Sequence, residues 1–132
     1  MDLKINETDK QDLNGAIAYM AHPFNGVDAN MFLSLVIASD IHKHIPGIVI
    51  VNPLTNFAYM PYEHNNYRQG IDACLALLDR CDVLILTGKW KDSKGCMAEY
   101  GFAKSRELPI YELSSDGVLT FISERVEDDD TD

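Results

Sequence analysis

The chain has 132 residues, of which 46% are hydrophobic, and its formal net charge is −10. This length fits a single domain, and no apolar run approaches the ~20 residues that a membrane-spanning helix needs. The excess of acidic residues argues against nucleic-acid binding. We therefore expect one soluble domain that binds neither a membrane nor a nucleic acid.

The two ends of the chain differ from its middle. Residues 1–14 are mostly polar, lack the apolar core of a signal peptide, and form a predicted N-terminal extension. Residues 124–132 hold six acidic side chains and one arginine, which predicts a disordered acidic tail. The folded domain is accordingly predicted to span residues 15–123.

The cysteines bear on location and cofactors. Cys74, Cys81 and Cys96 cannot all pair, each lies in or beside an apolar segment, and none belongs to a zinc-binding spacing. They are expected to be free thiols of a cytoplasmic protein. The sequence contains neither a glycine-rich dinucleotide motif nor a P-loop, and no metal or other cofactor is expected.

Apolar runs and helical patterns alternate along the middle of the chain. Short runs rich in apolar and β-branched residues predict buried strands, and longer apolar periodic patterns predict helices. The first long helix is expected to stop at Pro46-Gly47. The strands are predicted at 16–21, 48–54, 82–87 and 109–113, and the helices at 27–45, 70–81 and 96–108.

This alternation predicts an α/β fold. Continuous apolar strands joined through helices form a parallel sheet covered on both faces, with right-handed crossovers. The expected architecture is a flavodoxin-like or Rossmann-like three-layer sandwich with a parallel sheet of four to five strands. Residues 117–126 fit a short helix or an edge strand, and the pattern does not decide between them.

Ligands of such a fold bind at the loops that follow the carboxyl ends of the strands. Here those loops contain His22, Phe24 and Asn25 after the first strand, Tyr67 after the second, and Trp90 after the third. Aromatic rings beside amides suit a planar ligand that is stacked and hydrogen-bonded at its edges. Alternatively, His22 is an ordinary surface residue and Trp90 packs against a partner subunit.

The segment DSKGCMAEYGFAK, from Asp92 to Lys104, contains the strongest candidate site. Gly95 permits a turn and a close approach of the backbone to a ligand. Glu99 follows about one helical turn later, so its carboxylate can point back towards the loop. Ser93, together with the first N–H groups of the helix, offers an anion site. In the simpler alternative, Ser93 or Asp92 only caps the helix and Glu99 faces solvent.

Residues 82–110, DVLILTGKWKDSKGCMAEYGFAKSRELPI, resemble the signature segment of the nucleoside 2-deoxyribosyltransferase superfamily. That superfamily includes N-glycosidases of deoxynucleoside 5′-monophosphates and families of unassigned function. The shared pattern is a strand with an acidic start, then S-x-G, three residues, a glutamate, and G-x-A. The first strand and loop, AIAYMAHPFNG, are also similar. The loop GKWKDSKG, which follows the third strand, is closest in sequence to the unassigned branch.

The resemblance implies roles for individual residues. Glu99 matches the nucleophile that attacks the anomeric carbon of the sugar, Tyr19 matches the tyrosine that orients it, and Ser93 matches a serine that contacts a 5′-phosphate. The implied activity is cleavage or exchange of the N-glycosidic bond of a (deoxy)nucleoside or nucleoside monophosphate, without a cofactor. Members commonly complete the pocket across a subunit interface, so a homo-oligomer is also implied.

One position departs from the superfamily pattern. An aspartate is usual eight residues before the acid that starts the third strand, which is Asp82 here, and counting back reaches Cys74. The nearest acid is Asp72, about 200° away around an ideal helix. Either Asp72 serves as the third catalytic residue, or the chain lacks that residue. In the second case the protein is a non-catalytic nucleotide-binding protein, such as a sensor or a sequestering protein.

Overall fold

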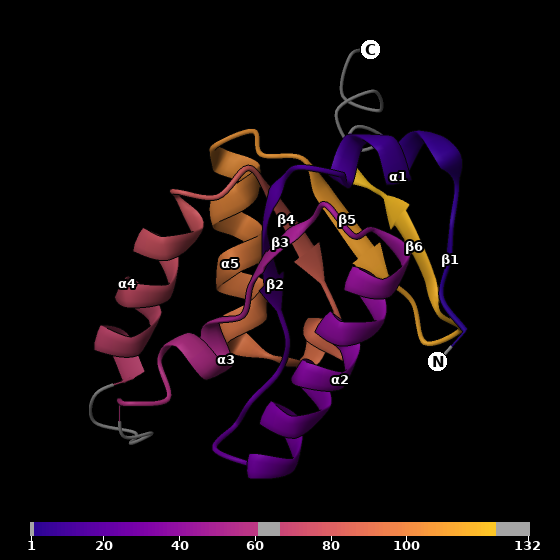
Figure 1. Ribbon diagram of the computed structural model, residues 1–132. Coiled ribbons are helices and arrows are strands. Elements are labelled where there is room, and N and C mark those ends of the chain that lie inside the picture. The colour runs from indigo at the N-terminus through magenta and orange to yellow at the C-terminus, as the bar shows by residue number, and fades with distance from the viewer. Residues whose placement is uncertain (1, 61–66, 124–132) are drawn as a thin grey trace.

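The computed structural model describes residues 2–60 and 67–123, and within these ranges the chain forms a mixed α/β fold with a six-stranded sheet (Figure 1). The predicted acidic tail, residues 124–132, lies outside the described residues. The strands are β1 (Lys4–Ile5), β2 (Ile17–Ala21), β3 (Val49–Val51), β4 (Val83–Leu86), β5 (Ile110–Leu113) and β6 (Val118–Phe121). The helices are α1 (Glu7–Leu13), α2 (Asp28–His44), α3 (Pro53–Asn56), α4 (Tyr67–Leu78), the short 3-10 helix η2 (Trp90–Asp92) and α5 (Lys94–Ser105).

The sheet is mostly parallel, in the order β1-β6-β5-β4-β2-β3. The four strands predicted from the sequence, β5-β4-β2-β3, are neighbours in the sheet and pair in parallel. The predicted parallel sheet of four to five strands is nevertheless only partly correct, because β6 pairs antiparallel with β5. The reason is the short turn between them, in which the Gly117 N–H donates to the Ser114 carbonyl at 3.0 Å, since a tight turn joins only antiparallel strands.

The first fourteen residues, expected as an extension, contribute β1 and α1 to the fold. β1 pairs in parallel with β6, which also decides the alternatives left open at the C-terminal end in favour of a strand. Asn6 caps α1 by accepting a hydrogen bond from the Asp9 N–H at 2.7 Å, and Leu13 at the end of this helix is fully buried. This short segment is therefore held in place by the helix cap, by the buried Leu3 and Leu13, and by the pairing of β1 with β6.

Helices cover both faces of the sheet (Figure 1). One cluster of buried residues joins α1 and α2 to the strands, and a second joins α4 and α5 to them. Successive residues of a strand point to opposite faces, so Met20 belongs to the first cluster and Tyr19 to the second. The candidate site predicted on the sequence segment of α5 therefore lies on the α4 and α5 side of the sheet.

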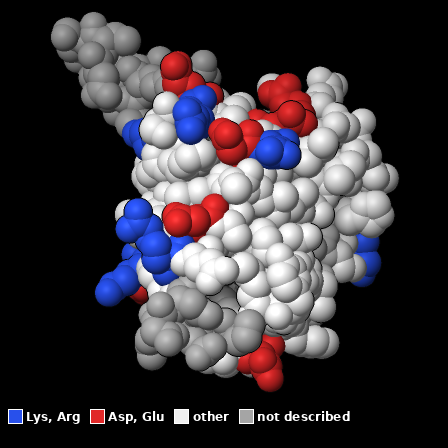
Figure 2. Space-filling view, turned by 90° about the vertical axis from the view of Figure 1, so that its left-hand side faces the viewer, with Lys and Arg blue, Asp and Glu red and all other residues white. Residues whose placement is uncertain are grey.

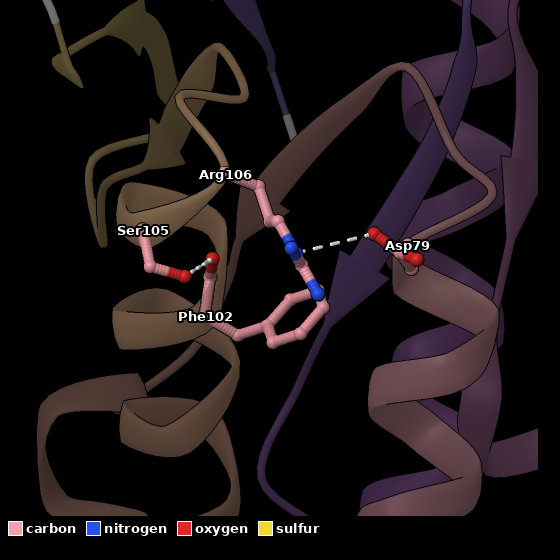
Figure 3. A network of polar contacts seen from close by, with 4 residues as sticks. All are labelled: Asp79, Phe102, Ser105 and Arg106. Atoms are coloured by element: carbon pink, nitrogen blue, oxygen red, sulfur yellow. Dashed lines mark hydrogen bonds and ion pairs between the residues drawn. The ribbon is translucent and has the colours of Figure 1, made fainter.

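The C-terminal ends of α4 and α5 are joined by a polar contact (Figure 3). The guanidinium of Arg106, which follows α5, lies 3.4 Å from a carboxylate oxygen of Asp79, which follows α4. The same guanidinium lies over the ring of Phe102, 4.9 Å from its centroid. Both charged side chains are about half exposed, so the pair adds little to stability.

Three further features of the described residues bear on the sequence expectations. None of their helices is long and apolar enough to cross a membrane. All three cysteines are free, and Cys81 and Cys96 are buried. Asp82 accepts a hydrogen bond from the Ile17 N–H at 2.9 Å, so this acid joins the starts of two strands at the edge opposite to the candidate site.

Candidate functional site

A cavity of about 530 Å³ lies at the carboxyl ends of β2, β3 and β4. The chain leaves β2 to form β3 on one side and later β4 on the other, so the cavity lies at the point where the strand order reverses. All three loops singled out in the sequence contribute to its wall, and so does the N-terminal half of α4. The described lining residues are His22, Phe24, Asn25, Gly26, Asp28, Met31, Pro53, Leu54, Phe57, Ala58, Met60, Tyr67, Gln69, Gly70, Ile71, Cys74, Ser93, Gly95, Cys96 and Glu99.

Glu99 lies on the core-facing stripe of α5. The buried residues of this helix are Cys96, Glu99 and Ala103, at the spacing of three and four residues that places side chains on one helix face. Glu99 is only 5% exposed and lines the cavity. The alternative in which Glu99 faces solvent is therefore wrong.

The carboxylate of Glu99 is held by Tyr19. The Tyr19 hydroxyl, on a fully buried side chain of β2, donates a hydrogen bond to Oε2 of Glu99. Within residues 2–60 and 67–123, the other oxygen, Oε1, has no hydrogen-bond partner. It is not fully buried, and Glu99 lines the cavity. One oxygen is thus fixed by the protein while the other is free to meet a ligand.

Burial changes the acid–base properties of this pair. Desolvation raises the pKa of Glu99 to about 7, although the hydrogen bond from Tyr19 acts in the opposite direction. Desolvation and then the nearby charge of Glu99 raise the pKa of Tyr19 far above its ordinary value. Tyr19 therefore remains a hydrogen-bond donor at neutral pH, whereas Glu99 changes its charge there.

Cys74 of α4 lies at the same point. Its thiol is close enough to Tyr19 and Glu99 to interact with both, and it lines the cavity. Burial, followed by the charge of Glu99, raises the pKa of Cys74 to about 11, so the thiol is protonated at neutral pH. Cys96, one turn before Glu99, also lines the cavity, and burial raises its pKa to about 12.

Asp72 is not brought to this site. Its carboxylate lies 3.5 Å from the Arg68 guanidinium on the outer side of α4, its side chain is 63% exposed, and it does not line the cavity. Asp72 and Cys74 are two positions apart, about 200° around the helix, so they lie on opposite sides of α4. The position eight residues before Asp82 thus faces the cavity with a thiol instead of a carboxylate.

Ser93 and Gly95 are both at the cavity, in a local structure that differs from the expected loop. Ser93 is the N-cap of α5, and its Oγ accepts a hydrogen bond from the Cys96 N–H at 3.2 Å. Gly95 lies inside the first turn of the helix, where a Cβ would meet only Ile71 at 3.5 Å and Ser93 at 3.8 Å. Gly95 therefore keeps the cavity wall open, and no turn depends on it.

The residues after β2 form one wall of the cavity. His22 is only 6% exposed, so the alternative of an ordinary surface histidine is wrong. Asn25 has a left-handed backbone, with φ of 53°, a conformation that asparagine tolerates better than most residues. Asn30, in the first turn of α2, donates to the Phe24 carbonyl at 2.8 Å and so holds this loop against the helix.

The two remaining aromatic candidates are placed differently. Tyr67, the first residue of α4, lines the cavity and is 42% exposed. Trp90 is buried outside the cavity, where its Nε1 donates to Glu112 at 2.9 Å and its ring packs against Tyr100. The structure therefore brings together the predicted residues Glu99, Tyr19, Ser93, Gly95, His22, Phe24, Asn25 and Tyr67, but neither Asp72 nor Trp90.

Comparison with known families assigns the chain to one of them. Residues 16–112, more than half of the chain, match the family described as "Domain of unknown function (DUF4406)". The chain belongs to the DUF4406 family. No curated protein matches it. The DUF4406 range contains every described residue that lines the cavity, whereas β1, α1 and β6 lie outside it.

Several cavity residues of this DUF4406 protein were missed in the sequence. Leu54 is predicted at the end of a strand, but Asn52 caps the short helix α3, which carries Leu54 into the cavity wall. Ile71 and Cys74 were hidden in a helix whose facing side the sequence does not reveal. The position eight residues before Asp82 is Cys74, but a cysteine does not supply the acid that the superfamily pattern has there.

Proposed function

We propose that this protein cleaves or exchanges the N-glycosidic bond of a (deoxy)nucleoside or a nucleoside monophosphate, with Glu99 as the reacting carboxylate. The observation that carries the proposal is the position of Glu99. It is a buried carboxylate with one oxygen held by a buried tyrosine and the other open to a cavity. A buried ionisable group with a shifted pKa in a cavity is typical of catalytic sites.

The chemistry explains why a carboxylate is needed. Breaking the bond between the sugar C1′ and the base nitrogen develops positive charge on the sugar, which a carboxylate stabilises or captures. In the covalent route, Glu99 Oε1 bonds to C1′ while the C1′–N electron pair leaves with the base, which takes a proton from water. Attack on C1′ by water releases the sugar and Glu99, and attack by a second base gives exchange.

Tyr19 acts as a positioning residue in this proposal. Its hydroxyl fixes one oxygen of Glu99, so that the other keeps its direction towards the cavity. Attack needs the ionised carboxylate, and the pKa of Glu99 is about 7. Turnover is therefore expected to rise with pH up to about 7 and then to level off.

The sequence resemblance supports the same reaction class. The S-x-G, glutamate and G-x-A spacing of Ser93 to Ala103 resembles that of the nucleoside 2-deoxyribosyltransferase superfamily. The DUF4406 family has no assigned function, so membership of this superfamily is part of the proposal. The four parallel strands with helices on both faces agree with the three-layer, flavodoxin-like arrangement expected for it. We also propose a cytoplasmic location, on the ground of the three free cysteines.

A second candidate function is favoured by the helix α4. Asp72 lies outside the cavity, and Cys74 offers a protonated thiol in place of a carboxylate. A protein without that acid binds a nucleoside or nucleotide without turning it over, and serves as a sensor or a sequestering protein. In that case Glu99 accepts hydrogen bonds from the sugar hydroxyls.

The proposal includes self-association. On α2 the side chains of Phe32, Leu33, Leu35 and Val36 are 69%, 46%, 48% and 42% exposed, an apolar surface on a helix whose first turns also line the cavity. A second copy of the chain on this surface would bury apolar area beside the cavity mouth. A monomeric mass at micromolar concentration in analytical ultracentrifugation would count against it.

The test of the function is release of free base. The protein is incubated with a panel of nucleosides and their 5′-monophosphates, each with and without a second base, and the products are separated chromatographically. Wild type should release or exchange at least one base, and Glu99→Gln, which keeps the shape and removes the charge, should lose more than the ~10²–10⁴-fold typical of a lost general acid or base.

The outcomes separate the two candidate functions. If Glu99→Gln turns over within a few-fold of wild type, Glu99 is not the reacting group. If no base is released but a nucleoside or nucleotide raises the melting temperature, the binding protein is the correct assignment. If nothing in the panel is cleaved or bound, both are wrong.

A further inference from the structure

His22 lies in the cavity wall and has no role in the proposed reaction of Glu99. It follows directly after β2, its ring is nearly buried, and it lines the same cavity as Glu99. Its Nδ1 lies 2.9 Å from Oγ1 of Thr87, the residue after β4. His22 and Thr87 therefore join the ends of the two central strands.

The hydrogen bonds of Thr87 assign the tautomer of His22. The Thr87 hydroxyl donates its one hydrogen to the Ala21 carbonyl at 2.7 Å, so it can only accept from the imidazole. Nδ1 of His22 must then carry a hydrogen and donate it to Thr87. Burial lowers the pKa of His22, which keeps the ring neutral at pH 7 and leaves Nε2 as a bare acceptor.

The ring is also held from the other strand. Gly88 has a left-handed backbone with φ of 63°, and a Cβ at this position would lie 2.8 Å from Cε1 and 3.0 Å from Nδ1 of His22. Only glycine leaves room for the imidazole there. Within the described part of the chain Nε2 has no hydrogen-bond partner, and it is not sealed in the interior. This unpaired acceptor therefore belongs to the cavity.

The charges around the cavity disfavour an anionic ligand. The acidic side chains that line it are Asp28 and Glu99, of which Glu99 is partly ionised at neutral pH, and the described lining contains neither lysine nor arginine. Figure 2 shows a broad uncharged area across the centre and right of the face that carries α4, with lysines and arginines towards the upper part and the margins. A bound phosphate would thus meet the Asp28 carboxylate, the partly ionised Glu99 and the lone pair of Nε2, with only the N-terminus of α5 to offset them.

We propose that Nε2 of His22 is a fixed hydrogen-bond acceptor that selects ligands with an N–H or O–H group at that point, and that the cavity takes an uncharged nucleoside in preference to its 5′-monophosphate. The nucleoside class rests on the proposed function. The preference itself rests on His22, Thr87, Gly88 and the anionic lining. His22 is accordingly a specificity residue, and Ser93 caps α5 without holding a phosphate.

The experiment compares binding of matched ligands to the full chain by isothermal titration calorimetry at low salt. Each nucleoside that binds is paired with its 5′-monophosphate, and with analogues methylated at single N–H or O–H groups. Wild type should bind the nucleoside at least tenfold more tightly than the monophosphate, and methylation of one donor should cost about tenfold, as expected for one hydrogen bond to a buried acceptor.

Two substitutions of His22 form a matched pair. Asn can reach Thr87 as Nδ1 does but lacks an atom at the place of Nε2, whereas Gln can place an acceptor near Nε2. His22→Asn should therefore weaken nucleoside binding about tenfold and no longer distinguish the methylated analogue from its parent. His22→Gln should retain that distinction. Equal loss of discrimination in both variants, or in neither, overturns the role of Nε2.

The wild-type measurement stands even if a variant fails to fold. Tighter binding or faster cleavage of the monophosphate overturns this inference while the proposed function survives. Absence of binding and cleavage with every nucleoside and monophosphate overturns both.

Discussion

The side chains that β2 directs to the two faces of the sheet differ in kind. Ala18 and Met20 enter a mainly apolar cluster with α1 and α2. Tyr19 enters the cluster below α4 and α5, where its hydroxyl meets the carboxylate of Glu99 beside the Cys74 thiol. Neighbouring residues of one strand thus pack into an apolar core on one face of the sheet and form a buried polar site on the other.

The α2 side of the sheet contributes more to the stability of the fold than the site on the α5 side does. Buried aliphatic side chains on the α2 face stabilise the fold by leaving water. On the α5 face, burial of Glu99 disfavours its ionised form, which is why its pKa is about 7. A buried group that opposes folding is retained for another reason, and a functional site is the usual one.

The largest expected effect on folding comes from the aliphatic face. Met20→Ala should lower the free energy of unfolding by about 2–5 kcal/mol, because it leaves a cavity among fully buried neighbours. The pKa of Glu99 should stay near 7, since Met20 points away from it. Urea unfolding and the side-chain carboxyl shift in ¹³C NMR measure the two quantities. A displaced Glu99 titration would show that the two faces are not independent.

The second prediction concerns Glu99 and pH. The unfolded carboxyl titrates near 4.5 and the folded one near 7, so wild type loses stability as the pH rises between these values. Glu99→Gln removes this loss. Above pH 7 the variant should be more stable than wild type by on the order of 3 kcal/mol, and near pH 4.5 the difference should vanish. Thermal unfolding at pH 5 and pH 8 tests this; a variant that is less stable at both values contradicts it.

The third prediction isolates the Tyr19 hydroxyl. Its hydrogen bond lowers the pKa of Glu99, so Tyr19→Phe should raise that pKa further and move any pH–rate profile to higher pH. Tyr111→Phe is the matched control, because Tyr111 is a buried tyrosine in the α2-side cluster. Carboxyl NMR titrations of both variants provide the measurement. An unchanged Glu99 titration in Tyr19→Phe would remove Tyr19 from its positioning role.

The smallest expected effect belongs to Asp72. Asp72→Asn should leave binding or turnover within a few-fold of wild type and change stability by less than about 1 kcal/mol, because its pair with Arg68 is exposed. Cys74→Asp is the contrasting variant: a carboxylate beside Glu99 should raise the pKa of Glu99 through like-charge repulsion. A large loss of activity in Asp72→Asn would show that α4 turns its other side to the ligand.

Much of the fold was accessible from the sequence because its central strands are short apolar runs between clear breaks. The predicted strand 16–21 corresponds to β2, and the parallel core has the expected strands. The strand predicted at 48–54 ends early, at Val51, because Asn52 caps α3 and Pro53 suits the first helical position. The two-residue strand β1 escaped prediction because its partner β6 is more than a hundred residues away.

The candidate site, like the fold, was predictable from the sequence only in part. The residue types that follow each strand, the Ser93 to Glu99 segment among them, and a tyrosine on the first strand can all be read from the sequence. Only the tertiary structure decided that Glu99 meets Tyr19, that Cys74 and not Asp72 faces them, and that Thr87 orients His22. The physical reason is that side-chain spacing is a local property, whereas the rotation of α4 about its axis and contacts across 65 or 80 residues depend on the packing of the whole domain.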